Sequence, residues 1–169
     1  VGRFELYEKI TSHSVLSENE SKEWSKVEIR FNKICLEASK KDIMVLVDAE
    51  ESWIQTAIDE LVTKMMNIYN SEKAVVFNTI QAYRKDRFDY LTKLHNDLKD
   101  SVKIGVKLVR GAYMEKERRR AKKYNYISPI CENKQQTDDV FNNSLSFIIE
   151  NINDFGLFCL LYTSDAADE

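Results

Sequence analysis

The sequence is poor in the residues that mark the commonest cofactor and metal sites. Its four glycines are scattered, and none belongs to a GxGxxG or Walker pattern that would cradle a phosphate. The two histidines, His13 and His95, lie far apart and have no spacing typical of metal ligands. A dinucleotide held by a Rossmann fingerprint and a histidine-based metal site are therefore excluded, and we expect no metal.

Long apolar runs and a strong charge of one sign are also missing. No hydrophobic stretch approaches the ~20 residues of a membrane-spanning helix, so we expect no transmembrane segment. The formal net charge of -3 gives no reason to expect a nucleic-acid partner. Cys35, Cys131 and Cys159 are widely spaced and form no CxxC pair, which indicates reduced thiols in an intracellular compartment.

Helical and strand-like segments alternate along the 169 residues. Apolar residues at helical spacing predict helices at residues 17–40, 53–69, 86–100 and 137–152, with a charged helix from 114. Short apolar runs predict strands at residues 43–47, 74–81, 104–109 and 155–161. Such alternation indicates parallel strands buried on both faces, in either an open α/β sheet or a (β/α)8 barrel. Ser17 and Glu20 fit a capping box at the start of the first of these helices.

Polar residues recur where the predicted strands end, at Asp48, Gln81, Lys107 and Arg110. In a parallel sheet these positions converge on one rim, where α/β proteins carry out their chemistry. Structural roles remain open for each of them: Asp48 could cap the next helix, Gln81 could satisfy backbone groups, and the two cations could form structural ion pairs. Alternation along the strand places Lys107 and Arg110 on opposite faces.

The run from Met114 to Lys123 carries six cations and two anions. It could bind nucleic acid or a lipid surface. A solvated helix face with ion pairs one turn apart is the commoner role of such a run, and we favour it here.

Three segments, DAEESW at 48–53, FNTIQAY at 77–83 and KLVRGAYMEKER at 107–118, closely resemble the proline dehydrogenase family, of the single-function bacterial and mitochondrial type. The resemblance extends over residues 1–159. It implies an α/β fold that is about half of a (β/α)8 TIM-type barrel, and FAD as cofactor. It also implies oxidation of L-proline to Δ1-pyrroline-5-carboxylate in proline catabolism, with electrons passed to a quinone at a membrane surface. The expected location is cytoplasmic and peripheral to the bacterial inner membrane, or the matrix side of the mitochondrial inner membrane.

The resemblance also assigns roles residue by residue. It implies that Asp48 and Lys107 are catalytic, with Lys107 as the cation near the reactive edge of the flavin. The residues matched to flavin contacts are Val47, Gln81, Arg110, Gly111 and Ala112. Those matched to the lining of the substrate site are Tyr113 and Met114. A fixed cation in a dry site would stabilise the negative charge that hydride transfer delivers to the flavin.

Some of the family pattern is missing. A strand with a substrate-contacting lysine is expected before Val1, a histidine is absent from 158–163, and residues 160–169 read as a tail of doubtful origin. The late arginine pair that holds the substrate carboxylate is also absent. We therefore expect the 169-residue chain alone to be inactive. Two other hypotheses are an aldolase that uses Lys107 to form a Schiff base and an inert gene remnant.

Overall fold

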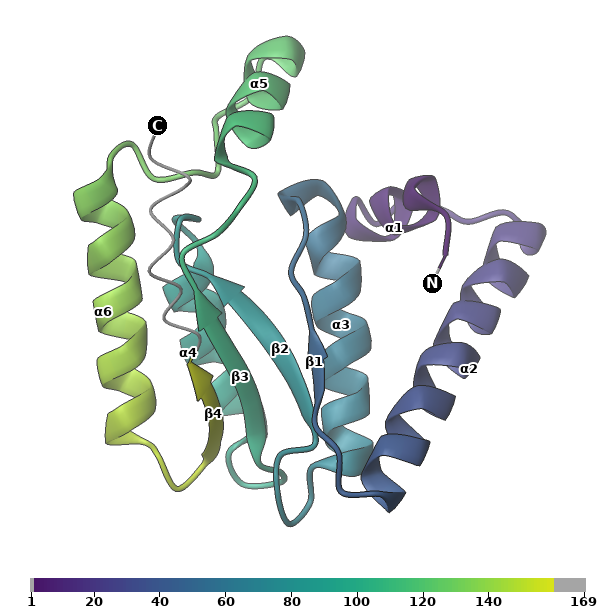
Figure 1. Cartoon of the computed structure of the whole chain (residues 1–169). Helices are drawn as coiled ribbons and strands as arrows, with labels where there is room; N and C mark the ends of the chain where they lie inside the picture. Colours follow the sequence, from purple (N-terminus) through teal and green to yellow (C-terminus); the bar gives the residue numbers. More distant parts are fainter. Residues whose placement is uncertain (1, 160–169) are drawn as a thin grey trace.

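A single parallel sheet forms the centre of the computed structural model, which describes residues 2–159 (Figure 1). Within that range the sheet has four strands in the order β1-β2-β3-β4. Their bounds are Val45–Val47, Val76–Gln81, Ile104–Val109 and Phe155–Cys159. All three pairings are parallel, so the carboxyl ends of the strands lie at one edge of the sheet. The parallel sheet predicted from the sequence is confirmed.

Helices connect the strands and cover one face of the sheet. The helices are α1 (Phe4–Thr11), α2 (Glu18–Lys40), α3 (Ser52–Tyr69), α4 (Arg87–Leu98), α5 (Met114–Tyr124) and α6 (Lys134–Glu150). Helices α3 and α4 pack against β2, and α6 packs against β3. Figure 1 shows α5 beyond the carboxyl ends of the strands, and α1 and α2 on the side of α3 away from α4.

The core follows from the apolar stripes of these elements. Helix α3 buries a continuous face that includes Ile54, Leu61, Val62 and Met65, and every residue of β2 is buried. At α2, Ser17 and Glu20 exchange hydrogen bonds in the predicted capping box. Such caps satisfy backbone N–H groups that a helix start would otherwise leave unpaired.

Several predicted boundaries differ from the observed ones: β2 begins at Val76 rather than at residue 74, and α6 spans Lys134–Glu150 rather than 137–152. Strand β1 begins at Val45, while Ile43 and Met44 are more than half exposed, because the edge of the sheet offers them no neighbour to pack against. The eight-residue helix α1 was not predicted from the sequence. The predictions for 160–169, including the end of the last strand and the doubtful tail, lie outside the described residues. Within residues 2–159, no helix combines the length and apolarity needed to cross a membrane.

Candidate active site

The carboxyl ends of the strands bring Asp48 and Lys107 together. Asp48 directly follows β1, Lys107 lies in β3, and the Lys107 ammonium donates a hydrogen bond to the Asp48 carboxylate. The Lys107 side chain is 13% exposed, whereas that of Asp48 is 74% exposed. The convergence predicted from the strand ends is therefore present, and the ammonium is the buried member of the pair.

The Asp48–Lys107 pair lies on the face of the sheet that α3 and α4 do not cover. The side chain of Asn78 in β2 points toward the helices, where it bonds to Asp59 and Tyr90. Side chains alternate along a strand, so Thr79 points the other way, and Lys107 is its register partner in β3. The Thr79 hydroxyl donates to the Val47 carbonyl at 2.7 Å, which ties β1 to β2 beside this pair.

Arg110 does not join the Asp48–Lys107 pair. Its Nη1 donates to Asp138 Oδ1 of α6 at 2.5 Å, and its guanidinium lies 5.7 Å from the centre of the Phe141 ring. The prediction that Lys107 and Arg110 occupy opposite faces of the strand is confirmed. The second cation therefore belongs to the rim of the site next to α6, with half of its side chain exposed.

The turn after β3 requires glycine. Gly111 has φ of +128°, and a Cβ there would lie 2.1 Å from the Tyr83 ring. The Tyr83 N–H donates to the Arg110 carbonyl at 2.7 Å, so the turn is also fixed by its backbone. Ala112, which follows, is exposed. Glycine at 111 therefore lets the chain reverse closely over Tyr83 and present Ala112 to solvent.

Tyr113 is the N-cap of α5 and Met114 is its first residue, and both are partly buried. Burial, together with a hydrogen bond to Glu50, raises the pKa of Tyr113 to about 12. The phenol is therefore neutral at physiological pH and can donate a hydrogen bond.

Helix α5 is attached to the start of α3 by two of its charged residues. Glu117 is completely buried and accepts hydrogen bonds from the Ser52 N–H at 2.5 Å and from the Ser52 hydroxyl at 2.7 Å. Lys116 forms an ion pair with the buried Glu51. The prediction of a solvated helix face holds for exposed cations such as Arg119 but is wrong for Glu117. That carboxylate acts as a remote cap for α3, whose own N-cap Glu51 makes no side-chain cap bond.

Gln81, at the end of β2, is buried and points back to the loop after β1. Its Nε2 donates to the Glu50 carbonyl at 2.8 Å. The Glu50 N–H is held in turn by Gln55 Oε1 at 2.7 Å. Sequence analysis missed Gln55, together with Asp59 and Arg87 behind it. The available signals were their polar character on otherwise apolar helix faces and the one-turn spacing of Gln55 and Asp59.

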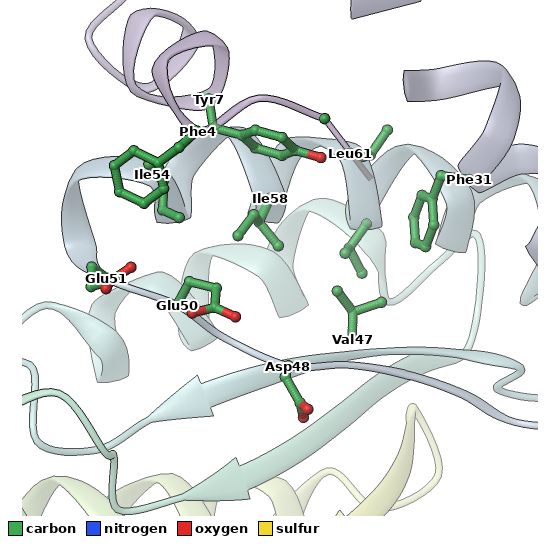
Figure 2. A pocket seen from close by; sticks show the side chains of 12 residues that line it. Phe4, Tyr7, Phe31, Val47, Asp48, Glu50, Glu51, Ile54, Ile58 and Leu61 are labelled. Atoms are coloured by element: carbon green, nitrogen blue, oxygen red, sulfur yellow. The ribbon is translucent and has the colours of Figure 1, made fainter. Parts of the chain in front are cut away.

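A pocket of about 470 Å³ lies beside β1, between α1, α2 and α3 (Figure 2). Its walls are mostly apolar, as with Phe31, Ile58 and Val47. Figure 2 shows the Asp48 side chain pointing away from these apolar groups. Asp48 and Glu50 also line this pocket, so the pocket reaches the residue that pairs with Lys107. Across residues 2–159, no group of histidine, cysteine and acidic side chains could hold a metal ion.

Comparison with known proteins identifies relatives over most of the chain. Residues 4–160 match the sequence profile of the family described as proline dehydrogenase. Proline dehydrogenase 2, mitochondrial, from Arabidopsis thaliana is 36% identical over 165 residues, which cover 94% of this chain and 34% of that protein. Hydroxyproline dehydrogenase from Xenopus laevis is 35% identical, over 88% of this chain and 32% of that protein. The chain thus spans about a third of the length of these relatives.

A solved structure has the same fold. It is proline utilization A from Bdellovibrio bacteriovorus, with a TM-score of 0.74 and 22% identity over 80% of this chain and 14% of that one. The likeness identifies the parallel sheet and its helices as part of a (β/α)8 barrel, which is one of the two architectures that the periodicity left open.

Proposed function

Because the chain belongs to the proline dehydrogenase family, we propose that it forms part of an FAD-dependent oxidoreductase of proline catabolism. The proposed reaction is the oxidation of L-proline to Δ1-pyrroline-5-carboxylate. The observation that carries this proposal is the Asp48–Lys107 pair at the carboxyl ends of parallel strands. The proposed extent of the barrel part is residues 1–159, with 160–169 as a separate tail.

The side chains at this rim fit a flavin. Lys107 supplies an ammonium and Arg110 a half-exposed guanidinium, and such groups suit an electron-rich ring and phosphate oxygens. FAD, when bound, takes up the hydride equivalent that is removed from proline. The residues proposed to hold it are Val47, Gln81, Arg110, Gly111 and Ala112, and those proposed to line the substrate site are Tyr113 and Met114.

Within this chain, Lys107 and Asp48 have the proposed catalytic roles. The Lys107 ammonium donates a hydrogen bond to the Asp48 carboxylate. A cation fixed in this way stabilises negative charge that develops beside it without first having to reorient. Asp48 would hold the ammonium in place, and the neutral Tyr113 phenol, which donates its one proton to Glu50, would form part of the wall of the site.

We further propose that electrons pass to a quinone at the surface of an inner membrane, either the bacterial one or the mitochondrial one. The support is the surface at the end of α5, where Lys122, Lys123, Tyr124, Tyr126 and Ile127 are all exposed. Lysines attract anionic lipid headgroups, and tyrosine and isoleucine side chains favour the headgroup and acyl boundary. Ile127 is 90% exposed, and it favours a lipid partner over nucleic acid because an aliphatic side chain offers no aromatic face on which a base could stack.

The test is a hybrid enzyme in which residues 4–159 replace the matching segment of Arabidopsis proline dehydrogenase 2. We expect the hybrid to bind FAD. We also expect that adding L-proline in the absence of oxygen bleaches the flavin absorbance of the hybrid. The unmodified Arabidopsis enzyme is the positive control. Hydroxyproline, tried in parallel, measures the substrate preference. A folded, flavin-loaded hybrid that proline does not reduce would contradict the proposal. Borohydride trapping of a substrate on Lys107 would favour the aldolase hypothesis instead.

A further inference from the structure

The backbone N–H and the backbone carbonyl of Glu50 are each held by a glutamine side chain. Gln55 Oε1 accepts from its N–H at 2.7 Å, and Gln81 Nε2 donates to its carbonyl at 2.8 Å. Both glutamines are almost completely buried, at 1% and 3% exposure. Glu50 lies two residues after Asp48, so these two bonds fix the backbone that carries the Asp48 carboxylate to Lys107.

The orientation of the Gln55 amide is dictated by its partners. A backbone N–H can only donate, so Gln55 must present its oxygen to Glu50. Its Nε2 then faces Asp59 Oδ1 at 2.8 Å, and an ionised carboxylate can only accept. The opposite orientation would place an NH₂ group against an N–H and an oxygen against a carboxylate. Asp59 therefore selects the amide orientation that holds Glu50.

Asp59 is in turn kept in place by buried donors. Arg87 Nη1 donates to Asp59 Oδ2 at 2.8 Å, and both side chains are 6% exposed. Asn78 Nδ2 donates to Asp59 Oδ1 at 2.8 Å. Burial alone would lower the pKa of Arg87, but Asp59 and Asp86 raise it above its usual value. A fixed guanidinium thus supports a chain of bonds from α4 through α3 to the loop after β1.

We propose that Gln55 is a positioning residue that holds Asp48 against Lys107, and that the Asp59–Arg87 pair fixes the Gln55 amide for this role. The catalytic part of this inference rests on the proposed function. The positioning part concerns only the loop backbone of this chain. The two parts can therefore be tested separately.

Amide hydrogen exchange in the 169-residue chain tests the positioning part. In Gln55→Met the Glu50 amide should exchange at least about tenfold faster, because its acceptor is lost. Asp59→Asn should act in the same direction, since a neutral amide can rotate and present its own N–H groups to Gln55. Asn70→Ala is the matched control: Asn70 is a buried amide that binds the backbone at the other end of β2. An unchanged Glu50 exchange rate in both Gln55→Met and Asp59→Asn would overturn the proposal.

Kinetics of the hybrid enzyme test the catalytic part. Gln55→Met should lower kcat about tenfold with a KM for proline within about twofold, as expected when only the transition state is affected. In an Asp48→Ala background the same change should cost less than about twofold, because Gln55 acts through Asp48. If Gln55→Met lowered kcat by the same factor with Asp48 present and with Asp48→Ala, this role would be refuted. An unmodified hybrid that proline does not reduce would refute the proposed function. The amide exchange rates of Glu50 would still show whether Gln55 holds the loop backbone.

Discussion

At the scale of single residues, Lys107 is the side chain on which the proposed chemistry most depends. It is the largely buried member of its ion pair, so solvent screens its charge less than that of an exposed lysine. In the hybrid enzyme, Lys107→Ala should slow proline-dependent flavin reduction at least ~100-fold, the scale of removing one preorganised electrostatic group. Stopped-flow absorbance measures the rate. The matched control is Lys103→Ala, since the exposed hydrogen bond of Lys103 to the Asn153 carbonyl lies at the opposite end of the sheet. A rate unchanged by Lys107→Ala would make this lysine structural.

The meeting of Asp48 and Lys107 could be predicted from the sequence, whereas their support could not. Both follow or interrupt apolar strand runs, and parallel strands bring such positions to one rim. The partners of Gln55 come from a loop, from its own helix and, through Asp59, from Arg87, which lies 28 residues beyond Asp59. No local period connects these elements. Gln55 and Asp59 are one helical turn apart on the buried face of α3, and that spacing was the available clue.

At the scale of elements, periodicity predicted the long and well-buried segments best. Helix α3 and strand β2 have continuous apolar patterns and were expected within two residues of their observed bounds. Helix α1 has only eight residues, too few for a clear period. The apolar run begins at Ile43 and Met44, two residues before strand β1 starts, and both side chains are exposed. Hydrophobicity records a tendency toward burial, but an edge position supplies no partner for it.

The capping box of α2 gives a prediction for acid conditions. Hydrogen bonds from Lys9 and from the Ser17 N–H lower the pKa of Glu20 to about 2, from 4.5. A carboxylate with a lowered folded-state pKa stabilises the protein above about pH 4.5, and the contribution disappears as the pH falls toward about 2. The difference in unfolding free energy between wild type and Glu20→Gln should shrink across that window. Urea unfolding followed by circular dichroism measures it.

The control for Glu20→Gln is Glu37→Gln, which removes one negative charge from the exposed end of the same helix, where Glu37 pairs with Lys40. A Glu20→Gln difference that stays constant from about pH 5 to about pH 2 would mean that the capping contacts do not hold Glu20 in its ionised form.

The exposed surface at the end of α5 gives a second prediction at this scale. The chain should bind vesicles that contain phosphatidylglycerol more tightly than pure phosphatidylcholine vesicles. Replacing Lys122 and Lys123 by glutamate should weaken that binding at least ~10-fold, because each lysine near an anionic surface contributes ~1 kcal/mol. Ile127→Ser should weaken it as well, through the loss of an apolar contact. Vesicle co-sedimentation measures the binding.

Controls for the vesicle experiment lie on α2 and just beyond it. Lys40 and Lys41 are exposed at its carboxyl end, and Ile29 is 66% exposed along it. If the α5 surface is the one that binds the vesicle, replacing both of these lysines by glutamate should leave vesicle binding within about twofold of wild type. Ile29→Ser should have equally little effect. Equal binding to both kinds of vesicle, or preferential binding to RNA, would contradict the lipid assignment.

At the scale of the whole molecule, the sheet is open at both sides within residues 2–159. Its outer strands are β1 and β4, and each pairs with one neighbour there. A closed barrel has no such edges, because every strand pairs on both sides. An apolar pocket of about 470 Å³ runs beside β1, so apolar side chains adjoin the open edge. Unpaired backbone groups next to exposed apolar surface favour pairing with another chain.

We therefore predict that the 169-residue chain associates with itself as its concentration rises, and sedimentation velocity measures this. Leu46→Lys places a charge in the middle of β1, and it should weaken association at least ~10-fold, equivalent to ~1.4 kcal/mol. Ile29→Lys is the matched control, since it introduces the same charge at an exposed apolar position of α2. Equal effects of the two changes would mean that general surface hydrophobicity drives association. A chain that stays monomeric at every concentration would mean that the edge of β1 is protected from pairing.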